Sequence, residues 1–381
     1  MGKITIETHD LRNLSSRLIE QWQELEDRAL QANAFMSPNF VLPAAQYLTP
    51  QKKLNCLFIF ESLQSSSRLI GLGIFEKVAG RRSFPLPHLV SYVTNTESFL
   101  SGLLLSEEQE HAATAARSFF DHARRLNGIH GIHFCQRCRN SSQGKLFDQI
   151  ATEQGSRWVG FDYTRPVLKR TEGQPNLLNQ HLSRNRLKKY RRARRRLYQQ
   201  GVFSFNIYRN IDAIHQRECA QTFVSLEDDG WKGSGGSSLH ANINKRKFFH
   251  DMTNRFAENG KLLWTQSQLD HQVVSSTCNL ISGRCGFAYK LGWLEKFQHA
   301  SPGMIQEIDL ANAFFDGRID LEEFDSCVDQ HSFLHHLWPG QRQISTGTFP
   351  LTSTGWLASR ATHAVRELKQ SLYPVSDKVM P

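Results

Sequence analysis

The predicted helices and strands occur twice in the same order, and this repeat restricts the possible fold more than any other feature of the sequence. In each half, two helices joined by a loop precede three strands, and helix, strand, helix and strand follow. Helical segments carry apolar residues three and four positions apart, whereas strand segments are short apolar runs bounded by turn residues. Because no clear identity joins the halves, the repeat is one of element order. We predict an α/β protein with two domains of similar topology and a ligand cleft between them.

The two copies occupy most of the chain. In the first copy we predict helices at residues 11–32, 41–48, 107–126 and 143–153, and strands at residues 54–60, 69–78, 88–93, 131–135 and 156–168. In the second copy we predict helices at residues 211–228, 244–259, 304–315, 331–338 and 355–372, and strands at residues 261–267, 273–281, 286–291, 318–324 and 342–349. At 381 residues the chain exceeds the usual size of one hydrophobic core. Polar and turn residues at 169–179 predict a boundary between domains 1–170 and 171–381.

A strongly basic segment follows this boundary. Residues 183–197 contain nine Lys and Arg residues and no acid, and Leu187, Tyr190, Ala193 and Leu197 recur at helical spacing. This pattern predicts an amphipathic helix with a narrow apolar seam. Such a surface suits a phosphate-rich ligand such as a nucleotide, an acyl carrier or RNA. A docked helix whose long cations stay solvated explains the same pattern without a ligand.

Charge and hydropathy indicate the class of protein. The formal net charge of +10 favours an anionic partner, but nucleotide phosphates, nucleic acid and acidic membrane surfaces all satisfy it. No run of 18 apolar residues is present, so no membrane span is predicted, and the N-terminus lacks the apolar run of a signal peptide. We therefore expect a soluble, cytoplasmic protein of unknown oligomeric state.

Cysteine and histidine spacing gives little support for a metal. The chain has seven cysteines, an odd number that does not resemble a disulfide framework. Cys135 and Cys138 have the spacing of a metal-binding pair, and Cys278 and Cys285 are the remaining thiols that a four-thiolate zinc site would need. His331 and His335 also have metal-ligand spacing, but no acidic motif lies near them. We expect reduced thiols and no metal.

A Gly/Ser-rich loop at residues 226–239 connects two predicted helices. It holds three acids, a Trp-Lys pair and several glycines, a composition that suits either a solvated turn or a polar binding site. Asp228 and Asp229 are candidate general bases, with Glu227 a weaker choice. Lys232 is a candidate to neutralise the charge of a phosphate or a substrate carboxylate. Trp231, Gly233 and Ser237 are candidates for substrate binding.

A second candidate region begins at Ser301. Ser301 and Pro302 suit the N-cap and first turn of the predicted helix, whose free amides and positive dipole end would then point at an anion. We expect Ser301, Gly303, Met304 and Lys290 to bind a phosphate-bearing donor. An ordinary capped helix is the alternative.

Two further residues are candidate catalytic groups. Tyr289 is a candidate hydrogen-bond donor to a developing oxyanion or a leaving thiolate. Asp325 lies at a predicted strand end, where α/β proteins commonly gather site residues. No Ser–His–Asp elbow, phosphate-cradling nucleotide loop or kinase signature is present, which disfavours hydrolases and phosphotransferases.

Several segments together resemble one family. They are Asn33-Ala-Phe-Met-Ser-Pro38, Gly230-Trp-Lys-Gly233 with Gly236-Ser-Ser-Leu239, Phe287-Ala-Tyr-Lys290 with Ser301-Pro-Gly303, Phe324-Asp-Ser-Cys327, and Leu337-Trp338. This set is similar to the CelD/BcsL-type (BioF2-like) acetyltransferases, which belong with the Fem aminoacyl transferases among GNAT-fold acyltransferases. The resemblance implies tandem GNAT-like domains and acyl transfer to an amine or hydroxyl, with acetyl-CoA or another acyl-CoA as co-substrate. It also implies a role in polysaccharide or cell-envelope biosynthesis.

The chain departs from that family at three places. Ala34 stands where the family usually has proline, and Glu-Asp-Asp precedes Gly230. The Gln/Arg-x-x-Gly-x-Gly/Ala pyrophosphate loop of ordinary GNAT enzymes is absent, so the donor is inferred from the resemblance. Three functions therefore stay open: an acyl-CoA-dependent acyltransferase with a small-molecule or saccharide acceptor, an aminoacyl transferase that uses charged tRNA, and a non-catalytic binding module.

Overall fold

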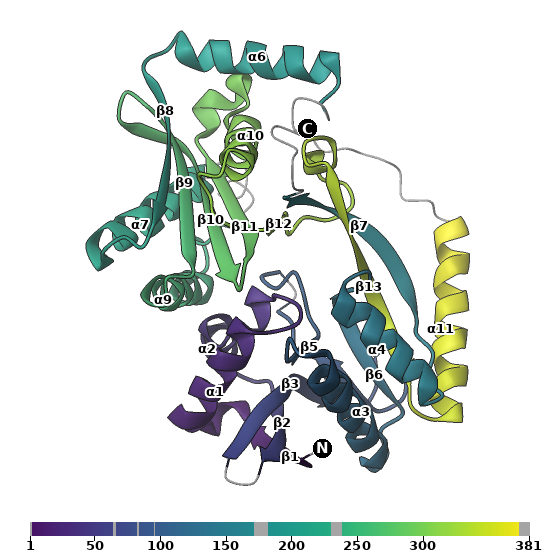
Figure 1. Cartoon of the computed structure of the whole chain (residues 1–381). Coiled ribbons are helices and arrows are strands. Elements are labelled where there is room, and N and C mark those ends of the chain that lie inside the picture. The colour runs from purple at the N-terminus through teal and green to yellow at the C-terminus, as the bar shows by residue number, and fades with distance from the viewer. Residues whose placement is uncertain are drawn as a thin grey trace. The chain divides into compact units, whose positions relative to one another are not determined.

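The computed structural model describes residues 2–63, 66–81, 84–94, 96–170, 182–229 and 238–372. It has mixed sheets flanked by helices, which confirms the predicted α/β class (Figure 1). The chain divides into two compact units, each described by itself below. Unit 1 comprises Met1–Pro38, Gln51–Thr164 and Arg342–Pro381, and unit 2 comprises Asn39–Pro50 and Arg165–Gln341.

Unit 1 is built on a mixed sheet. Strands β1 to β4 follow one another antiparallel, β4 pairs in parallel with β6, and β6 pairs antiparallel with β13, while β5 pairs with β3. The strands are β1 Lys3–Asp10, β2 Leu54–Leu63, β3 Ser66–Val78, β4 His88–Ser91, β5 Leu103–Leu105, β6 Gly131–Cys138 and β13 Gly340–Pro350. The helices are η1 Leu11–Asn13, α1 Ser16–Asp27, η2 Ala34–Met36, α3 Gln109–Arg125, α4 Ser142–Glu153 and α11 Ser353–Leu372.

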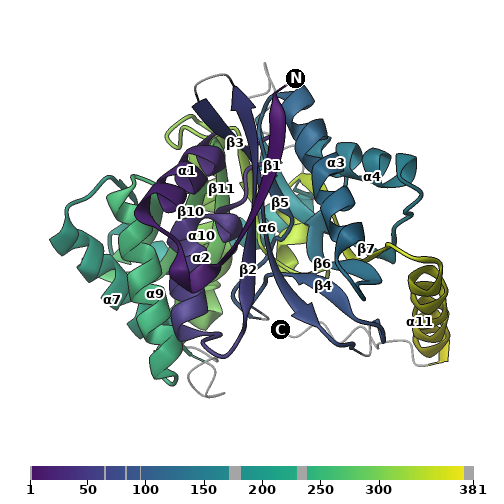
Figure 2. The ribbon, with the colours of Figure 1, turned by 90° about the horizontal axis from the view of Figure 1, so that it is seen from below.

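Helices cover both faces of strands β1 to β3. Figure 2 shows α1 on one face and α3 and α4 on the other. Helix α3 forms because Ala112, Ala115, Ala116, Phe119, Phe120 and Ala123 make one apolar stripe, which packs against a phenylalanine-rich core. Burial of each phenylalanine contributes about 1.5–3 kcal/mol to stability.

Unit 2 is also built on mixed strand pairing. Strands β8, β9, β10 and β11 are antiparallel neighbours, β11 pairs in parallel with β12, and β12 pairs antiparallel with the end of β7. The strands are β7 Val159–Lys169, which crosses the unit boundary, β8 Phe203–Arg209, β9 Leu262–Leu269, β10 Gln272–Ser282, β11 Cys285–Trp293 and β12 Glu323–Asp325. The helices are α2 Pro38–Tyr47, α6 Arg184–Tyr198, α7 Ala213–Asp229, α9 Ile243–Glu258, η3 Glu295–Ala300, α10 Pro302–Phe315 and η4 Phe333–His336. Helices α7 and α9 cover one face of β9 to β11 and α10 covers the other (Figure 1).

The two units share one strand topology but exchange parts of the chain. Each has four antiparallel strands, then a parallel neighbour, then a strand antiparallel to that neighbour. This last strand comes from the other half of the sequence in both: β13 pairs with β6 in unit 1, and residues 167–169 of β7 pair with β12 in unit 2. A division into domains 1–170 and 171–381 stays a prediction, whereas the compact units are interleaved in the sequence.

Several predicted elements differ from the structure. The predictions omitted β1 and β8, although both alternate apolar and polar residues as half-buried strands do. The strand predicted at residues 318–324 is β12, limited to residues 323–325. Ile319 and Leu321 are buried and alternate like strand residues, but the Ile319 N–H donates to the Ala313 carbonyl at the end of α10. The helix predicted at residues 331–338 is the 3-10 turn η4.

In the described part of the chain, no helix is both long and apolar enough to cross a bilayer. All seven cysteines are free thiols. No group of three or more His, Cys, Asp or Glu side chains among the described residues is placed to hold a metal ion.

Candidate functional site

One edge of β11 is only partly paired. Cys285, Gly286 and Phe287 pair with β12, which ends at Asp325, whereas β11 continues to Trp293. Residues 288–293 therefore extend beyond the pairing with β12, and we call them the open edge.

The open edge also contains a β-bulge. Cys278 of β10 pairs with Lys290 and Asn279 pairs with Ala288, so Tyr289 is the extra residue. A bulge bends its strand and redirects side chains, and bulges are frequent beside active sites. Tyr289 is 3% exposed, and its ring lies edge-on to Phe40 of α2, with the centroids 6.2 Å apart.

Helix α10 begins directly against the open edge. A Cβ atom placed on Gly303 would lie 3.2 Å from side-chain atoms of Leu291 and of Trp293. Farther along α10, the Phe314 ring contacts Phe324 of β12, with the centroids 6.2 Å apart. One face of α10 therefore runs from the end of β11 to β12.

The first turn of α10 lacks a side-chain cap. Pro302 occupies the first turn, as predicted. Ser301 stands at the N-cap, as predicted, but it adopts a left-handed conformation (φ 51°, ψ 56°) and its side chain caps no amide. This conformation costs about 1–3 kcal/mol in a residue other than glycine and is typical of functional sites. The first amides of a helix have no acceptor within the helix, and the positive end of its dipole favours an anion there.

The corresponding helix of unit 1, α3, differs at this point. Glu108 stands at its N-cap and Glu110 in its first turn, and Glu107 precedes them. These carboxylates already complement the helix dipole and would repel an anion. Of the two corresponding helix starts, α10 suits an anionic ligand and α3 does not.

Glu307 is a buried carboxylic acid on α10. It follows Gly303 by one helical turn, so both lie on the face of α10 that contacts the open edge. Glu307 is 3% exposed, and its Oε2 has no hydrogen-bond partner among the described residues. Burial raises its pKa to about 8. A carboxyl group with that pKa can take up and release a proton near neutral pH.

The basic helix α6 docks beside this region. Its predicted helical structure is confirmed at Arg184–Tyr198. The Arg194 Nη1 lies 2.7 Å from the Asp309 Oδ1 of α10, and the Arg196 Nη1 donates to the His299 carbonyl of η3 at 2.6 Å. The other seven cations of the helix are exposed. A cationic surface therefore adjoins the segment that leads into α10.

The three acids at the end of α7 have identifiable contacts. Glu227 is buried, accepts a hydrogen bond from the Leu239 amide and lies 3.8 Å from the Lys290 ammonium group. Asp228 accepts a hydrogen bond from the Ser238 hydroxyl, and Asp229 accepts one from the Glu295 amide at the start of η3. These contacts position the start of η3 and the end of the Gly/Ser loop relative to α7.

Asp325 ends β12, as predicted, and forms a buried ion pair. Its Oδ1 lies 3.4 Å from the Arg165 Nη1 and accepts a hydrogen bond from the Cys327 amide. Cys327 adopts a left-handed conformation (φ 57°). The ion pair and this conformation turn the chain away from β11 at the point where the pairing of β11 with β12 stops.

The predicted site residues thus fall into two groups. Asp228, Asp229, Tyr289, Lys290, Ser301, Gly303, Met304 and Asp325 all lie in unit 2, at the open edge or at the ends of α7, α10 and β12. Trp231, Lys232, Gly233 and Ser237 lie outside the described residues. Sequence reasoning missed Glu307, although Gln306, Glu307 and Asp309 interrupt an otherwise apolar helix and were a signal of polar function in the core.

Comparisons with known proteins give one family-model match to this region. Residues 184–333 match the family model described as an acetyltransferase (GNAT) domain. These residues run from α6 to the start of η4, and the open edge and α10 lie within them. The narrower CelD/BcsL-type assignment stays a prediction. No curated protein sequence matches the chain.

Two solved structures share the fold over nearly the whole chain. The crystal structure of FemX has a TM-score of 0.57 at 10% identity, covering 93% of this chain and 100% of that chain. A conserved protein of unknown function from Bacteroides thetaiotaomicron has a TM-score of 0.55 at 11% identity, covering 91% and 100%. At such identities the likeness concerns the fold alone.

Proposed function

We propose that this protein transfers an acetyl or other acyl group from acyl-CoA to an amine or hydroxyl of a polar acceptor, because residues 184–333 match the GNAT acetyltransferase family model. The observation that carries the proposal is the start of α10, which has no side-chain cap and packs against the bulged strand β11. The acceptor class that we propose is a sugar or amino sugar in polysaccharide or cell-envelope biosynthesis.

The residues present suit an acyl-CoA donor. The amides of Gly303 and Met304 would bind its phosphates at the positive end of the α10 dipole, and Lys290 and the cations of α6 would add positive charge. The donor supplies the thioester that is cleaved. The protein must orient that bond, exclude water and move one proton from the acceptor to the leaving thiolate.

We assign the proton transfer to Glu307. It is the acid of α10 that faces the open edge, and its raised pKa suits exchange near neutral pH. Tyr289, Asp228, Asp229, Lys232 and Asp325 remain proposed contributors to catalysis, and Trp231, Gly233 and Ser237 remain proposed acceptor-binding residues.

Calorimetry with acetyl-CoA and longer acyl-CoAs tests donor binding. The informative variant is Ser301→Asp, because aspartate tolerates the left-handed conformation and stabilises a helix start, yet its charge repels phosphate. Acyl-CoA affinity should fall at least tenfold while thermal stability holds. The matched control is Ser15→Asp at the N-cap of α1, which should leave affinity unchanged.

No binding by any acyl-CoA to the unaltered protein would exclude this donor. Equal binding by the Ser301→Asp variant would show that the donor binds elsewhere. Catalysis is tested by Glu307→Gln, which should lower CoA release with amino-sugar acceptors by roughly 10²–10⁴-fold without weakening acyl-CoA binding. Glu295→Gln, an exposed acid nearby, is the control and should retain full activity.

The exposed cations of α6 favour a second candidate, an aminoacyl transferase that takes its donor from charged tRNA. Arg191, Arg192 and Arg195 are exposed, whereas Arg194 and Arg196 contact the protein. Changing the three exposed residues to Gln should lower tRNA affinity at least tenfold and flatten its salt dependence, with α6 still docked. Unchanged tRNA affinity would exclude this candidate.

A further inference from the structure

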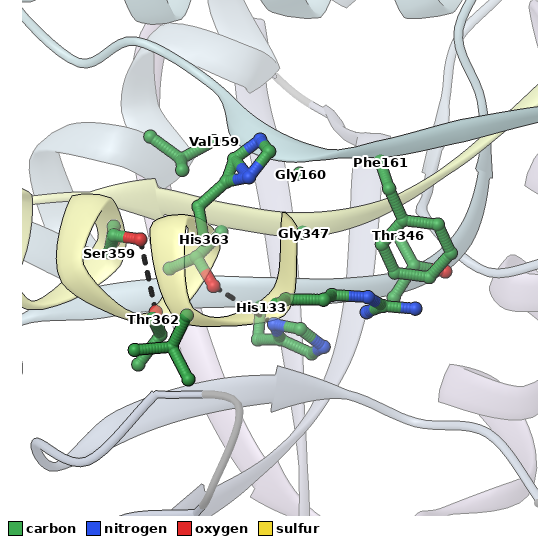
Figure 3. Close-up of a pocket in the computed structure, with 12 residues that line it drawn as sticks. His133, Val159, Gly160, Phe161, Thr346, Gly347, Ser359, Thr362 and His363 are labelled. Atoms are coloured by element: carbon green, nitrogen blue, oxygen red, sulfur yellow. Dashed lines mark hydrogen bonds between the residues drawn. The ribbon is translucent and has the colours of Figure 1, made fainter. Parts of the chain in front are cut away.

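A cavity of about 290 Å³ lies within unit 1, apart from every residue used above. Strands β6, β7 and β13 and helix α11 line it (Figure 3). Its size is at the lower end for small-molecule sites, which suits a ligand smaller than a typical drug. No carboxylate lines the cavity, whereas one arginine and two histidines do.

Arg366 is the permanent cation of the cavity. Its guanidinium carbon lies 3.4 Å from the Phe161 ring centroid, and no hydrogen bond or ion pair with a described residue holds the group. Stacking on an aromatic ring orients the guanidinium plane and leaves its edge free for two parallel hydrogen bonds to an oxyanion.

The buried imidazole of the cavity, His133, is neutral at physiological pH. Burial and the neighbouring His88, Arg81 and Arg366 lower the pKa of His133 to about 4. Its Nδ1 is 2.9 Å from the Thr348 hydroxyl, and its Nε2 has no hydrogen-bond partner among the described residues. His133 therefore offers a hydrogen-bonding group and no charge.

Other groups complete a site for an amphipathic ligand. Ser359 is 2% exposed, and its hydroxyl has no hydrogen-bond partner within the described part of the chain. A hydroxyl rotates freely to suit a partner, and leaving it unpaired costs about 1–3 kcal/mol. Val159, Val365 and the glycine pair Gly160 and Gly347 add apolar surface without further charge.

We propose that this cavity binds a small organic acid, with its carboxylate on Arg366 and its apolar body against Val159 and Val365. A single permanent cation matches one negative charge, whereas a phosphate dianion would need more positive charge. The ligand would also give the Ser359 hydroxyl and the His133 Nε2 their missing partners.

Calorimetry on the full chain at pH 7 tests the proposal, with benzoate, hexanoate and inorganic phosphate as probes. A carboxylate should bind, and phosphate should bind more weakly. Arg366→Gln should weaken carboxylate binding at least tenfold, and Arg366→Lys, which keeps the charge without the planar fork, about threefold to tenfold. Arg360→Gln is the matched control, because Arg360 is exposed on the same helix and does not line the cavity.

Three results would overturn the proposal. They are no carboxylate binding to the unaltered protein, carboxylate binding by both Arg366 variants as tight as by the unaltered protein, or tighter binding of phosphate than of the carboxylates. Retained binding by Ser301→Asp would confirm that this site is separate from the proposed donor site.

Discussion

At the scale of single residues, two buried titratable groups mark the two candidate sites. Glu307 on α10 and His133 on β6 are both under 10% exposed, and neither makes an ion pair with a described residue. Burial acts on them in opposite directions, because it disfavours the charged form of each. It raises the pKa of the acid and lowers the pKa of the base.

Glu307 should make the protein less stable as pH rises. Its pKa is about 8 in the folded protein and about 4.5 when unfolded, so the folded state binds the proton more tightly. The contribution of Glu307 to the free energy of unfolding is therefore at its maximum below pH 4.5. It falls as the pH rises to 8, by an amount on the order of 3–5 kcal/mol. Glu307→Gln mimics the protonated form. It should be more stable than the unaltered protein at pH 8 and equally stable near pH 4.5, as measured by urea unfolding.

A stability difference between the unaltered protein and Glu307→Gln that does not change with pH would contradict this prediction. Glu295→Gln is the control here too. Glu295 is exposed to solvent, so its substitution should change stability only slightly at any pH.

His133 should make the protein less stable as pH falls. Its pKa is about 4 when folded and about 6.5 when unfolded, so the unfolded state binds more protons between these values. The contribution of His133 to the free energy of unfolding is at its maximum above pH 6.5. It is lost as the pH falls to 4, a change on the order of 3 kcal/mol. The stability difference between the unaltered protein and His133→Gln should shrink by that amount from pH 7 to pH 4.

Thr348→Val is the control for His133, since it removes the hydrogen bond but keeps the imidazole. Its pH dependence should resemble that of the unaltered protein. A constant offset between His133→Gln and the unaltered protein across this range would contradict the prediction.

At the scale of elements, the contacts of one residue, Arg194, hold the very polar helix α6 against the rest of unit 2. Only Ala193 and Leu197 of α6 are buried, so its apolar seam is narrow. Arg194 adds an ion pair to Asp309 and stacks on Tyr190, Tyr198 and Phe203, with its guanidinium carbon 5.4–5.8 Å from the ring centroids. Charge and stem packing together compensate for the small apolar contact.

Arg194→Ala should destabilise the docking of α6. It leaves Asp309, which is 5% exposed, without its ion pair, at a cost of about 2 kcal/mol once partial exposure of Arg194 is allowed for. Hydrogen exchange of α6 amides should accelerate accordingly. The Arg194→Ala, Asp309→Asn double variant should recover part of the loss, because the buried charge is gone. Equal losses in the single and double variants would contradict this account.

At the scale of the whole molecule, the two compact units are interleaved in the sequence. Residues 344–350 of β13 pair with β6 in unit 1, and residues 167–169 of β7 pair with β12 in unit 2. Residues 39–50 of the first half likewise belong to unit 2. Each half of the sequence supplies structure to both units.

Separate expression of residues 1–170 and 171–381 tests this interleaving. The first fragment lacks β13, so β6 becomes an exposed sheet edge, and such edges promote aggregation. We expect that fragment to aggregate alone and to copurify with the second fragment when both are produced together. A monomeric 1–170 fragment with a cooperative unfolding transition would contradict the expectation.

The sequence by itself determined what local pattern encodes. Apolar periodicity predicted the α/β class, the repeated order and most helices and strands, because each segment needs one apolar face. It also singled out Ser301, Gly303 and Asp325, since turn residues and helix starts have local signatures. The short strands β1 and β8 carried the same kind of signal, in period-two alternation, and were missed.

Tertiary structure alone decided the rest, because burial and partner choice depend on residues far apart in the chain. The sequence of α10 shows an acid in an apolar helix, but only packing removes Glu307 from water and leaves its Oε2 without a hydrogen-bond partner among the described residues. Likewise, only strand pairing places β13 beside β6 and ends the pairing of β11 with β12 at Phe287. Hydrogen bonds between distant strands follow the lowest free energy of the whole chain, which no local window of sequence contains.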